Sequence, residues 1–191
     1  MKFATNNKKI NEIKSDCLMV SVFDDGKLRG ATKLVNTSNG KLIEDFIKNK
    51  DIQGKIGQTR IIPVTGKSYK RIVLVGCGTF ENFSQKNYRK AVISALKKIS
   101  LSNHKKVVSL IHDGAENINS PKKAYRMARV LAESWHAISY QYTTTKESNH
   151  KKLNLRRIEI GTNGKKATKD LKIGLEHGDA IGKATQLVRH L

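Results

Sequence analysis

The sequence has few cysteines, few acidic residues and no long hydrophobic run. Its two cysteines, Cys17 and Cys77, sit in or beside apolar runs, which indicates reduced, buried thiols and excludes a disulfide framework. The longest apolar runs, such as residues 72–75, are far shorter than the roughly 20 residues of a membrane-spanning helix. The opening residues lack the apolar region of a secretory signal. We therefore expect a cytoplasmic protein with no membrane partner.

The motifs of common active sites are also missing. The sequence has no Walker A segment, no G-x-S-x-G elbow and no H-E-x-x-H. Its six histidines are scattered, without cysteine or carboxylate partners at metal-ligand spacing, and its 16 acidic residues are dispersed. A two-metal hydrolase needs clustered carboxylates to hold its ions. The residues alone therefore predict no catalytic, metal-binding or cofactor-binding residue in this chain.

The stretch RIVLVGCGTF (71–80) resembles the end of a nucleotide-binding strand. The dinucleotide fingerprint G-x-G-x-x-G would need a third glycine at position 81, after Gly76 and Gly78. Glu81 stands there, and its carboxylate would repel a pyrophosphate. The preferred interpretation is that the two glycines let the chain leave a central strand sharply, with no Cβ in the way.

Positive charge is what the chain has in excess. It has 37 Lys and Arg residues against 16 Asp and Glu residues, a net charge of +21, and such a surface attracts polyanions. Because 28 of the 37 basic residues are lysine, AT-rich coding alone would give this composition, and a solvated lysine-rich surface is the preferred interpretation. Arginine, the better phosphate ligand, is scarce. If DNA or RNA does bind, the candidate contacts are Lys97, Lys98, Lys105, Lys106, Lys151, Lys152, Arg156 and Arg157.

Apolar runs and helical periodicities alternate along the chain. Strands are predicted at 17–23, 58–64, 69–75, 105–111 and 151–160, and Gly66 favours a hairpin between the second and third. One helix is predicted from the low 30s to Lys48, with Leu34, Leu42, Ile43, Phe46 and Ile47 as apolar anchors. Three further helices are predicted. One follows a Ser84 cap, and one follows the pair Ser120-Pro121 and has an apolar face from Ala124 to Tyr142. The last begins at about Lys169. This alternation predicts an α/β fold with a mixed β-sheet between helices.

Three segments follow one another in a specific order: CLMVSVFDDGKLRGATKLVN (17–36), KDIQGKIGQTRIIPV (50–64) and KRIVLVGCGTFENFSQKNYRKA (70–91). Their order and spacing resemble the N-terminal domain of leucyl aminopeptidases, the cytosol aminopeptidase family of two-metal exopeptidases. Residues 128–148 are similar to a later helix of that domain, with Ser134 in place of a glycine. GLEHGDAIGKATQLVRHL (174–191) resembles the helix that joins the two domains of the family, with His190 where aspartate is usual.

The resemblance implies a non-catalytic domain with a macro-domain-like three-layer sandwich. We divide the chain into an accessory α/β domain, residues 1–165, and a linker helix, residues 166–191, whose small residues suit close packing. The parent would be a metal-dependent enzyme that removes N-terminal residues from peptides. Its two divalent ions, zinc or manganese, would be held by a C-terminal catalytic domain of the same protein, so this chain alone is expected to be inactive.

The resemblance also implies partners. The domain would pack on the catalytic domain and on neighbours in a hexamer, and DNA is a possible partner because some bacterial members of the family bind it. The macro-domain analogy further suggests a pocket for ADP-ribose or another nucleotide. Glu81 and the lack of a second glycine-rich phosphate loop argue against such a pocket.

Overall fold

The computed structural model describes residues 1–115, 122–140 and 153–189 of the chain. Its strands form one sheet in the order β1-β6-β5-β2-β4-β3. They are β1 (Lys2–Asn6), β2 (Ser15–Val22), β3 (Thr59–Pro63), β4 (Tyr69–Gly76), β5 (Lys106–Ser109) and β6 (Arg157–Gly161). Neighbouring strands are parallel except β3 and β4, which pair antiparallel as the predicted hairpin. The sheet is therefore mixed, as the sequence predicted.

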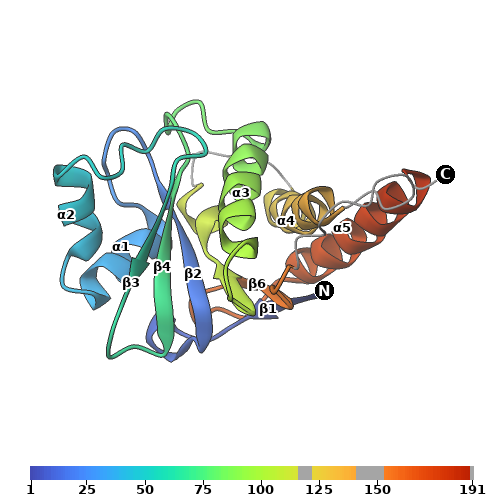
Figure 1. Ribbon diagram of the computed structural model, residues 1–191, viewed down its shortest axis with the longest axis horizontal. Helices are drawn as coiled ribbons and strands as arrows, with labels where there is room; N and C mark the ends of the chain where they lie inside the picture. The colour runs from blue at the N-terminus through green and yellow to red at the C-terminus, as the bar shows by residue number, and fades with distance from the viewer. Residues whose placement is uncertain (116–121, 141–152, 190–191) are drawn as a thin grey trace.

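Helices cover both faces of this sheet. They are α1 (Gly30–Ser38), α2 (Leu42–Lys48), α3 (Gln85–Ser100), α4 (Lys123–Ser139) and α5 (Lys169–Val188), with short 3₁₀ turns η1 (Ile10–Glu12) and η2 (Ile111–Gly114). Figure 1 shows α1 and α2 on one side of the sheet and α3, α4 and α5 on the other. The predicted arrangement, a mixed β-sheet between helices, is confirmed.

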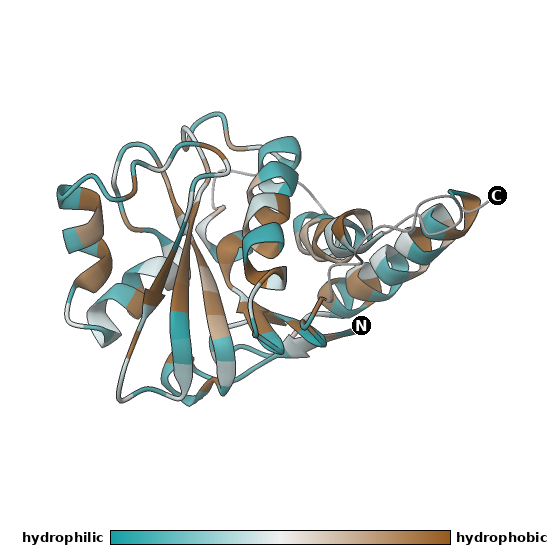
Figure 2. Cartoon of the chain, viewed as in Figure 1, coloured by the Kyte–Doolittle hydropathy of each residue, from teal (hydrophilic) through white to brown (hydrophobic). Residues whose placement is uncertain are grey.

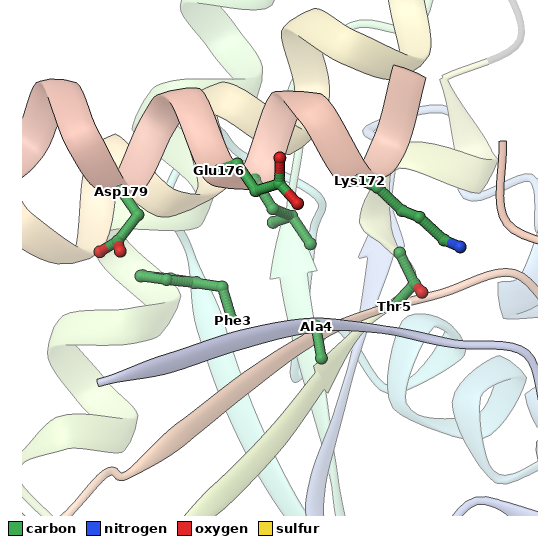
Figure 3. A pocket seen from close by; sticks show the side chains of 7 residues that line it. Phe3, Ala4, Thr5, Lys172, Glu176 and Asp179 are labelled. Carbon is green, nitrogen blue, oxygen red and sulfur yellow. The ribbon is translucent and has the colours of Figure 1, made fainter. Parts of the chain in front are cut away.

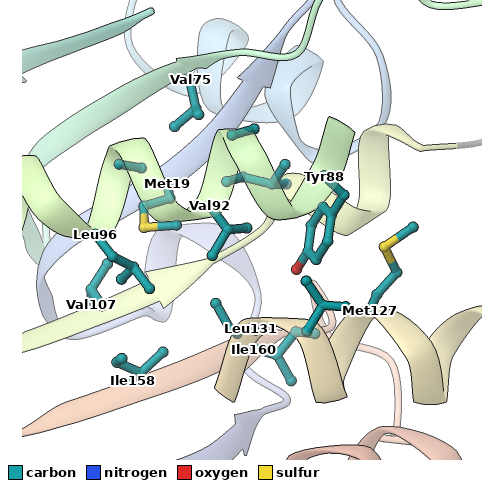
Figure 4. Close-up of a cluster of buried hydrophobic side chains, with 14 of the residues drawn as sticks. Met19, Val75, Tyr88, Val92, Leu96, Val107, Met127, Leu131, Ile158 and Ile160 are labelled. Atoms are coloured by element: carbon teal, nitrogen blue, oxygen red, sulfur yellow. The ribbon is translucent and has the colours of Figure 1, made fainter. Parts of the chain in front are cut away.

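The central strands bury both of their faces. Along β2, Cys17 and Met19 belong to the apolar cluster on the side of α3, α4 and α5, whereas Leu18 and Val20 belong to the cluster on the side of α1 and α2. Burial on both faces explains why these strands are continuous apolar runs in the sequence. The hydrophobic colour in Figure 2 accordingly follows the strands and the helix faces turned toward them. Figure 4 shows the larger cluster, in which side chains of the sheet meet those of α3 and α4.

The start of α3 was predicted correctly. Ser84 precedes the helix with extended backbone, and its Oγ accepts a hydrogen bond from the N–H of Asn87 at 3.4 Å. A serine in this position satisfies one of the N–H groups that a helix start leaves free. The predicted apolar face of this helix is buried throughout: Tyr88, Ala91, Val92, Ala95, Leu96 and Ile99.

The single helix predicted up to Lys48 is wrong, because the chain forms two helices there. Gly40 and Lys41 both adopt left-handed backbone, with φ of 63° and 65°, and this ends α1. The buried side chain of Asn36 then starts α2, since its Oδ1 accepts hydrogen bonds from the N–H groups of Ile43 and Glu44 at 3.0 and 3.1 Å. The predicted anchor Leu34 is instead 46% exposed.

Two predicted strands are shorter than expected, and one strand was missed. The strand predicted at 105–111 ends at Ser109, where the chain turns into η2. Of the strand predicted at 151–160, the described part pairs from Arg157 onward. The missed strand is β1, which pairs with β6 at one edge of the sheet. Ser120-Pro121 and Tyr142 lie outside the described residues.

Glycines on α5 let it pack closely against α4. A Cβ at Gly174 would lie 2.4 Å from the carbonyl oxygen of Tyr125, and a Cβ at Gly178 would lie 2.4 Å from that of Arg129. One further turn along, a Cβ at Gly182 would lie 2.4 Å from the ring of His136. Such distances are below any real contact, so this stripe of glycines sets the separation of the two helices. Of the small residues predicted to suit close packing, the three glycines have this role, whereas Ala180 and Ala184 are exposed.

We therefore expect Gly178→Val to destabilise the fold by about 2–4 kcal/mol, because the side chain forces α5 away from α4. The free energy of unfolding from urea titration measures this. Ala184→Val is the matched control, since Ala184 is exposed on the same helix and the new side chain meets solvent. Equal stability of the two variants would contradict the assigned role of the glycine.

Candidate functional site

Parallel pairing gives the sheet two different edges. The amino ends of β1, β6, β5, β2 and β4 meet at one edge, which we call the amino edge. Their carboxyl ends meet at the opposite edge, the carboxyl edge, where the connections to the helices begin. In open α/β sheets, ligands bind outside the carboxyl ends of the strands. The carboxyl edge is therefore the first place to search for a site.

At this edge two glycines, Gly76 at the end of β4 and Gly78 just after it, turn the chain. A Cβ at Gly76 would lie 2.0 Å from the carbonyl oxygen of Lys55, so an incoming loop packs directly on the backbone there. Gly78 has a φ of 76°, and its N–H donates to the carbonyl of Gly54 at 2.7 Å. The N–H of Gly76 donates to Gln58 at 2.7 Å. These N–H groups are therefore bonded to protein carbonyls and are not left to cradle a phosphate.

A pocket of about 750 Å³ lies further along this edge, and we call it the carboxyl-edge pocket. It opens between the beginnings of α1 and α4, the turn η2 and the segment from β6 to α5. Its walls carry three lysines, two aspartates and several apolar groups. The lining residues are Gly30, Lys33, Leu34, His112, Asp113, Lys123, Ala124, Met127, Asn163, Lys165 and Asp170.

The wall formed by α1 and η2 is tightly built. Gly30 has a φ of 49°, and a Cβ there would lie 2.5 Å from the carbonyl oxygen of Asp113. Burial lowers the pKa of the neighbouring His112 to about 4, so its ring is neutral at pH 7. Within the described part of the chain, the buried Nδ1 of His112 has no hydrogen-bond partner. This histidine therefore adds no charge to the pocket wall at pH 7.

A smaller pocket of about 310 Å³ lies between β1 and α5 (Figure 3). Phe3 and Thr5 of β1 point toward the helix, and Lys172 and Glu176 of α5 face them from above. Asp179 at its end is already bonded, to His136 Nε2 and to Lys183 Nζ, both at 2.7 Å. Asp179 therefore helps to hold α5 against α4 through its bond to His136.

The amino edge gathers basic residues. Arg157 of β6 lies in register with Lys106 of β5, and the N–H of Arg156 donates to the carbonyl of Lys105 at 2.8 Å. Six of the eight candidate contacts are brought to this edge: Lys97, Lys98, Lys105, Lys106, Arg156 and Arg157. Lys151 and Lys152 lie outside the described residues. Other basic residues, not predicted as contacts, lie in or just before the first three residues of strands at this edge: Lys2, Lys14, Lys70 and Arg71.

Two carboxylates neutralise part of this edge. Glu159, 3% exposed, accepts hydrogen bonds from Asn6 and from the candidate contacts Lys106 and Arg157. Burial would raise the pKa of Glu159, but these bonds hold it below its usual value. Asp16 likewise accepts from the backbone N–H groups of Lys105 and Lys106 and from Lys70 Nζ. Lys106 and Arg157 are thus partly engaged inside the protein.

Within residues 1–115, 122–140 and 153–189, no three His, Cys, Asp or Glu side chains come together as a metal site would require. Cys17 and Cys77 are buried and unpaired, and burial raises the pKa of both thiols to about 12. They are therefore protonated core residues, as predicted. No helix in these ranges has the length and apolar character needed to cross a membrane.

Comparison with known proteins supplies the family. Residues 19–149 match the model of the cytosol aminopeptidase family, N-terminal domain. The chain belongs to this family. One curated relative is the cytosol aminopeptidase of Buchnera aphidicola subsp. Acyrthosiphon pisum (strain APS), 32% identical over 196 residues. The match covers 100% of this chain and 38% of the relative, so the chain spans well under half the length of such relatives.

Solved structures confirm the fold of this cytosol aminopeptidase domain. A mutant of tomato leucine aminopeptidase superposes with a TM-score of 0.80 at 16% identity, covering 99% of this chain and 37% of that one. The macrodomain of Mycobacterium tuberculosis DarG superposes with a TM-score of 0.61 at 10% identity, covering 83% of this chain and 97% of that one. The predicted macro-domain-like three-layer sandwich is therefore confirmed.

Sequence reasoning missed the carboxyl-edge pocket of this domain. Its lining comes from four separate stretches, near positions 30, 112, 125 and 165, and no motif links them. The available signal was indirect. Each stretch follows a buried strand or opens a helix, and parallel strands bring such positions to one edge.

The burial of His112 predicts an acid-sensitive stability. The folded state favours the neutral ring, with a pKa of about 4 against 6.5 for a free histidine, so the unfolded chain takes up the proton first. Stability is therefore complete above pH 6.5 and falls as the pH drops toward 4. The loss assigned to this residue is about 2–3 kcal/mol.

Urea unfolding of the parent chain and of His112→Gln across this pH range measures the effect. The variant should lose less stability than the parent between pH 6.5 and 4. His177→Gln is the control, since His177 is exposed, and it should keep the parent's slope. Identical slopes for His112→Gln and the parent would refute the assignment.

Proposed function

We propose that this chain is the non-catalytic N-terminal domain of a leucyl aminopeptidase, where it supports domain packing and assembly of a hexamer. The observation that carries the proposal is the match to the family's N-terminal domain in a chain that spans 38% of the length of its relatives. The parent enzyme would release N-terminal amino acids from peptides in the cytoplasm. Two divalent ions, zinc or manganese, would act in its C-terminal catalytic domain.

The outer half of α5 supports a contact with that catalytic domain. The inner half buries Leu171 and Leu175 against the sheet cluster. The outer half extends past the body of the domain, as Figure 1 shows, and exposes Ile181, Leu187 and Val188 by 44%, 65% and 70%. Apolar side chains gathered on an extending helix are suited to burial against another domain.

An activity assay tests the assignment of the chain as non-catalytic. The purified chain, supplied with millimolar Mn²⁺ or Zn²⁺, should release no leucine from a chromogenic leucine amide, because its described part holds no clustered metal ligands. The full-length Buchnera relative serves as the positive control. Turnover by the chain alone would refute the proposal.

The reading frame beyond Leu191 is a second test. We expect it to continue into a carboxylate-rich catalytic domain. In that longer protein, replacing Leu187 and Val188 by lysine should lower the melting temperature or break the hexamer. Leu101→Lys, at a position that is also 65% exposed, should do neither.

A second candidate function is nucleic-acid binding, and the amino edge favours it. Adjacent strands lie about 4.8 Å apart, so the ends of five strands extend over about 19 Å, the length of some five phosphates along one DNA strand. Lys105 and Arg156 are exposed just before β5 and β6, and Lys97 and Lys98 are exposed in the last turn of α3. A competing explanation exists for two of them, since Lys97 and Lys98 lie in the last turn of α3, where positive charge stabilises a helix.

Binding to a fluorescent DNA duplex at several salt concentrations decides between these explanations. Phosphate contacts give an affinity that falls steeply with salt, and loss of two contacts should reduce the log–log slope by about 1 to 2. The test variant is Lys97→Gln with Lys98→Gln. The control, Lys86→Gln with Lys90→Gln, removes the same charge from exposed positions at the other end of α3. Absence of binding at low salt, or equal loss in both variants, would exclude a specific amino-edge contact.

A further inference from the structure

The carboxyl-edge pocket has no part in the proposed scaffold function, yet it has the features of a ligand site. It lies between β2 and β5, whose connections lead to opposite faces of the sheet, to α1 on one and α4 on the other. Crevices at such a switch point are where open α/β sheets bind ligands. Its volume of about 750 Å³ is also within the range of small-molecule sites.

The charges of the pocket identify the class of ligand. Three ammonium groups (Lys33, Lys123 and Lys165) and two carboxylates (Asp113 and Asp170) line it. No ion pair joins Lys33, Lys165, Asp113 or Asp170 to another of the described residues. Because the two carboxylates offset two of the three ammonium groups, the pocket has little net positive charge to hold a polyphosphate. A ligand that carries one charge of each sign would satisfy both kinds of group.

The remaining lining fits the rest of such a molecule. Leu34 and Met127 supply an apolar wall, and the amide of Asn163 can bond a peptide group. The amino end of α1, at Gly30, has no side-chain cap, and the carboxylate of Asp113 lies beside it, since Asp113 Oδ2 would be 2.9 Å from a Cβ on Gly30. His112 is neutral at pH 7, so it leaves the balance of charges unchanged.

We propose that the carboxyl-edge pocket binds a short zwitterionic peptide of two or three residues with apolar side chains. The α-carboxylate pairs with Lys33 at the amino end of α1. The α-ammonium pairs with Asp170 on the opposite wall, and the side chains lie on Leu34 and Met127. The inference stands on the pocket and does not depend on the parent protein being a peptidase.

Calorimetry with three related peptides tests the proposal on the purified chain. The probe is Leu-Leu, and its derivatives are N-acetyl-Leu-Leu, which lacks the ammonium, and Leu-Leu amide, which lacks the carboxylate. Each derivative should bind about tenfold more weakly than Leu-Leu, because one charge pair is lost. Equal binding of all three, no binding of Leu-Leu, or tighter binding of inorganic phosphate would overturn the proposal.

Two variants assign the two ends of the peptide. Lys33→Gln should weaken Leu-Leu about tenfold and leave the binding of Leu-Leu amide unchanged, because that derivative has no carboxylate to lose. Asp170→Asn should weaken Leu-Leu and leave N-acetyl-Leu-Leu unchanged. If Lys33→Gln instead left N-acetyl-Leu-Leu binding unchanged and Asp170→Asn left Leu-Leu amide binding unchanged, the assigned orientation would be overturned.

The controls are Lys67→Gln and Asp51→Asn, which make the same charge changes at exposed positions that do not line the pocket. They should bind Leu-Leu as the parent chain does, and a loss equal to that of the pocket variants would show that only net charge matters. A thermal melt of each variant confirms that it is folded. Because no activity is measured, failure of this test is separate from failure of the proposed function.

Discussion

Parallel pairing of β1, β6, β5, β2 and β4 is the constraint on which the other features depend. It separates the beginnings of these five strands from their ends, and the helices that follow β2, β4 and β5 return along the sheet. The amino ends of α1 and α4 therefore meet at the carboxyl edge, beside the pocket. The last turn of α3, with Lys97 and Lys98, comes to the amino edge with the first residues of the strands. Parallel pairing thus places the uncapped start of α1 beside the pocket and gathers basic residues at the opposite, amino edge.

How much of the fold the sequence predicts depends on burial. Strands with both faces buried, such as β2 and β4, are plain in the sequence as continuous apolar runs. β1 was missed because it is an edge strand, and three of its residues (Phe3, Ala4 and Thr5) are only partly buried, so the apolar signal is diluted. The break between α1 and α2 was missed for another reason. It depends on a buried Asn36 that bonds across seven and eight positions, and helical periodicity cannot reveal a side chain acting in this way.

The two candidate sites differ in the same respect. Lys105-Lys106 and Arg156-Arg157 are doublets in front of apolar runs, so they could be found by inspection of the sequence. Their adjacency could not, because β5 and β6 pair only after a helix has intervened. The carboxyl-edge pocket is harder to predict from the sequence, since no single stretch contributes more than a few of its residues. Its mixed charges become informative only when the fold shows Lys33 and Asp170 in one pocket.

The glycine stripe of α5 connects the packing of the domain to the proposed contact with a catalytic domain. Close contact at Gly174, Gly178 and Gly182 extends along α4 as far as His136, whose ring fills the space that a Cβ on Gly182 would need. His136 Nε2 also bonds Asp179 at 2.7 Å, and Gln186 donates to the carbonyl of His136 at 2.7 Å. The outer half of α5 is thereby held by α4 as well as by its own backbone. A helix fixed in this way holds its exposed apolar residues at a set distance and angle from the sheet, because α5 cannot bend toward α4 where their backbones are already in contact. A rigid support needs this property if it is to hold a second domain in one orientation.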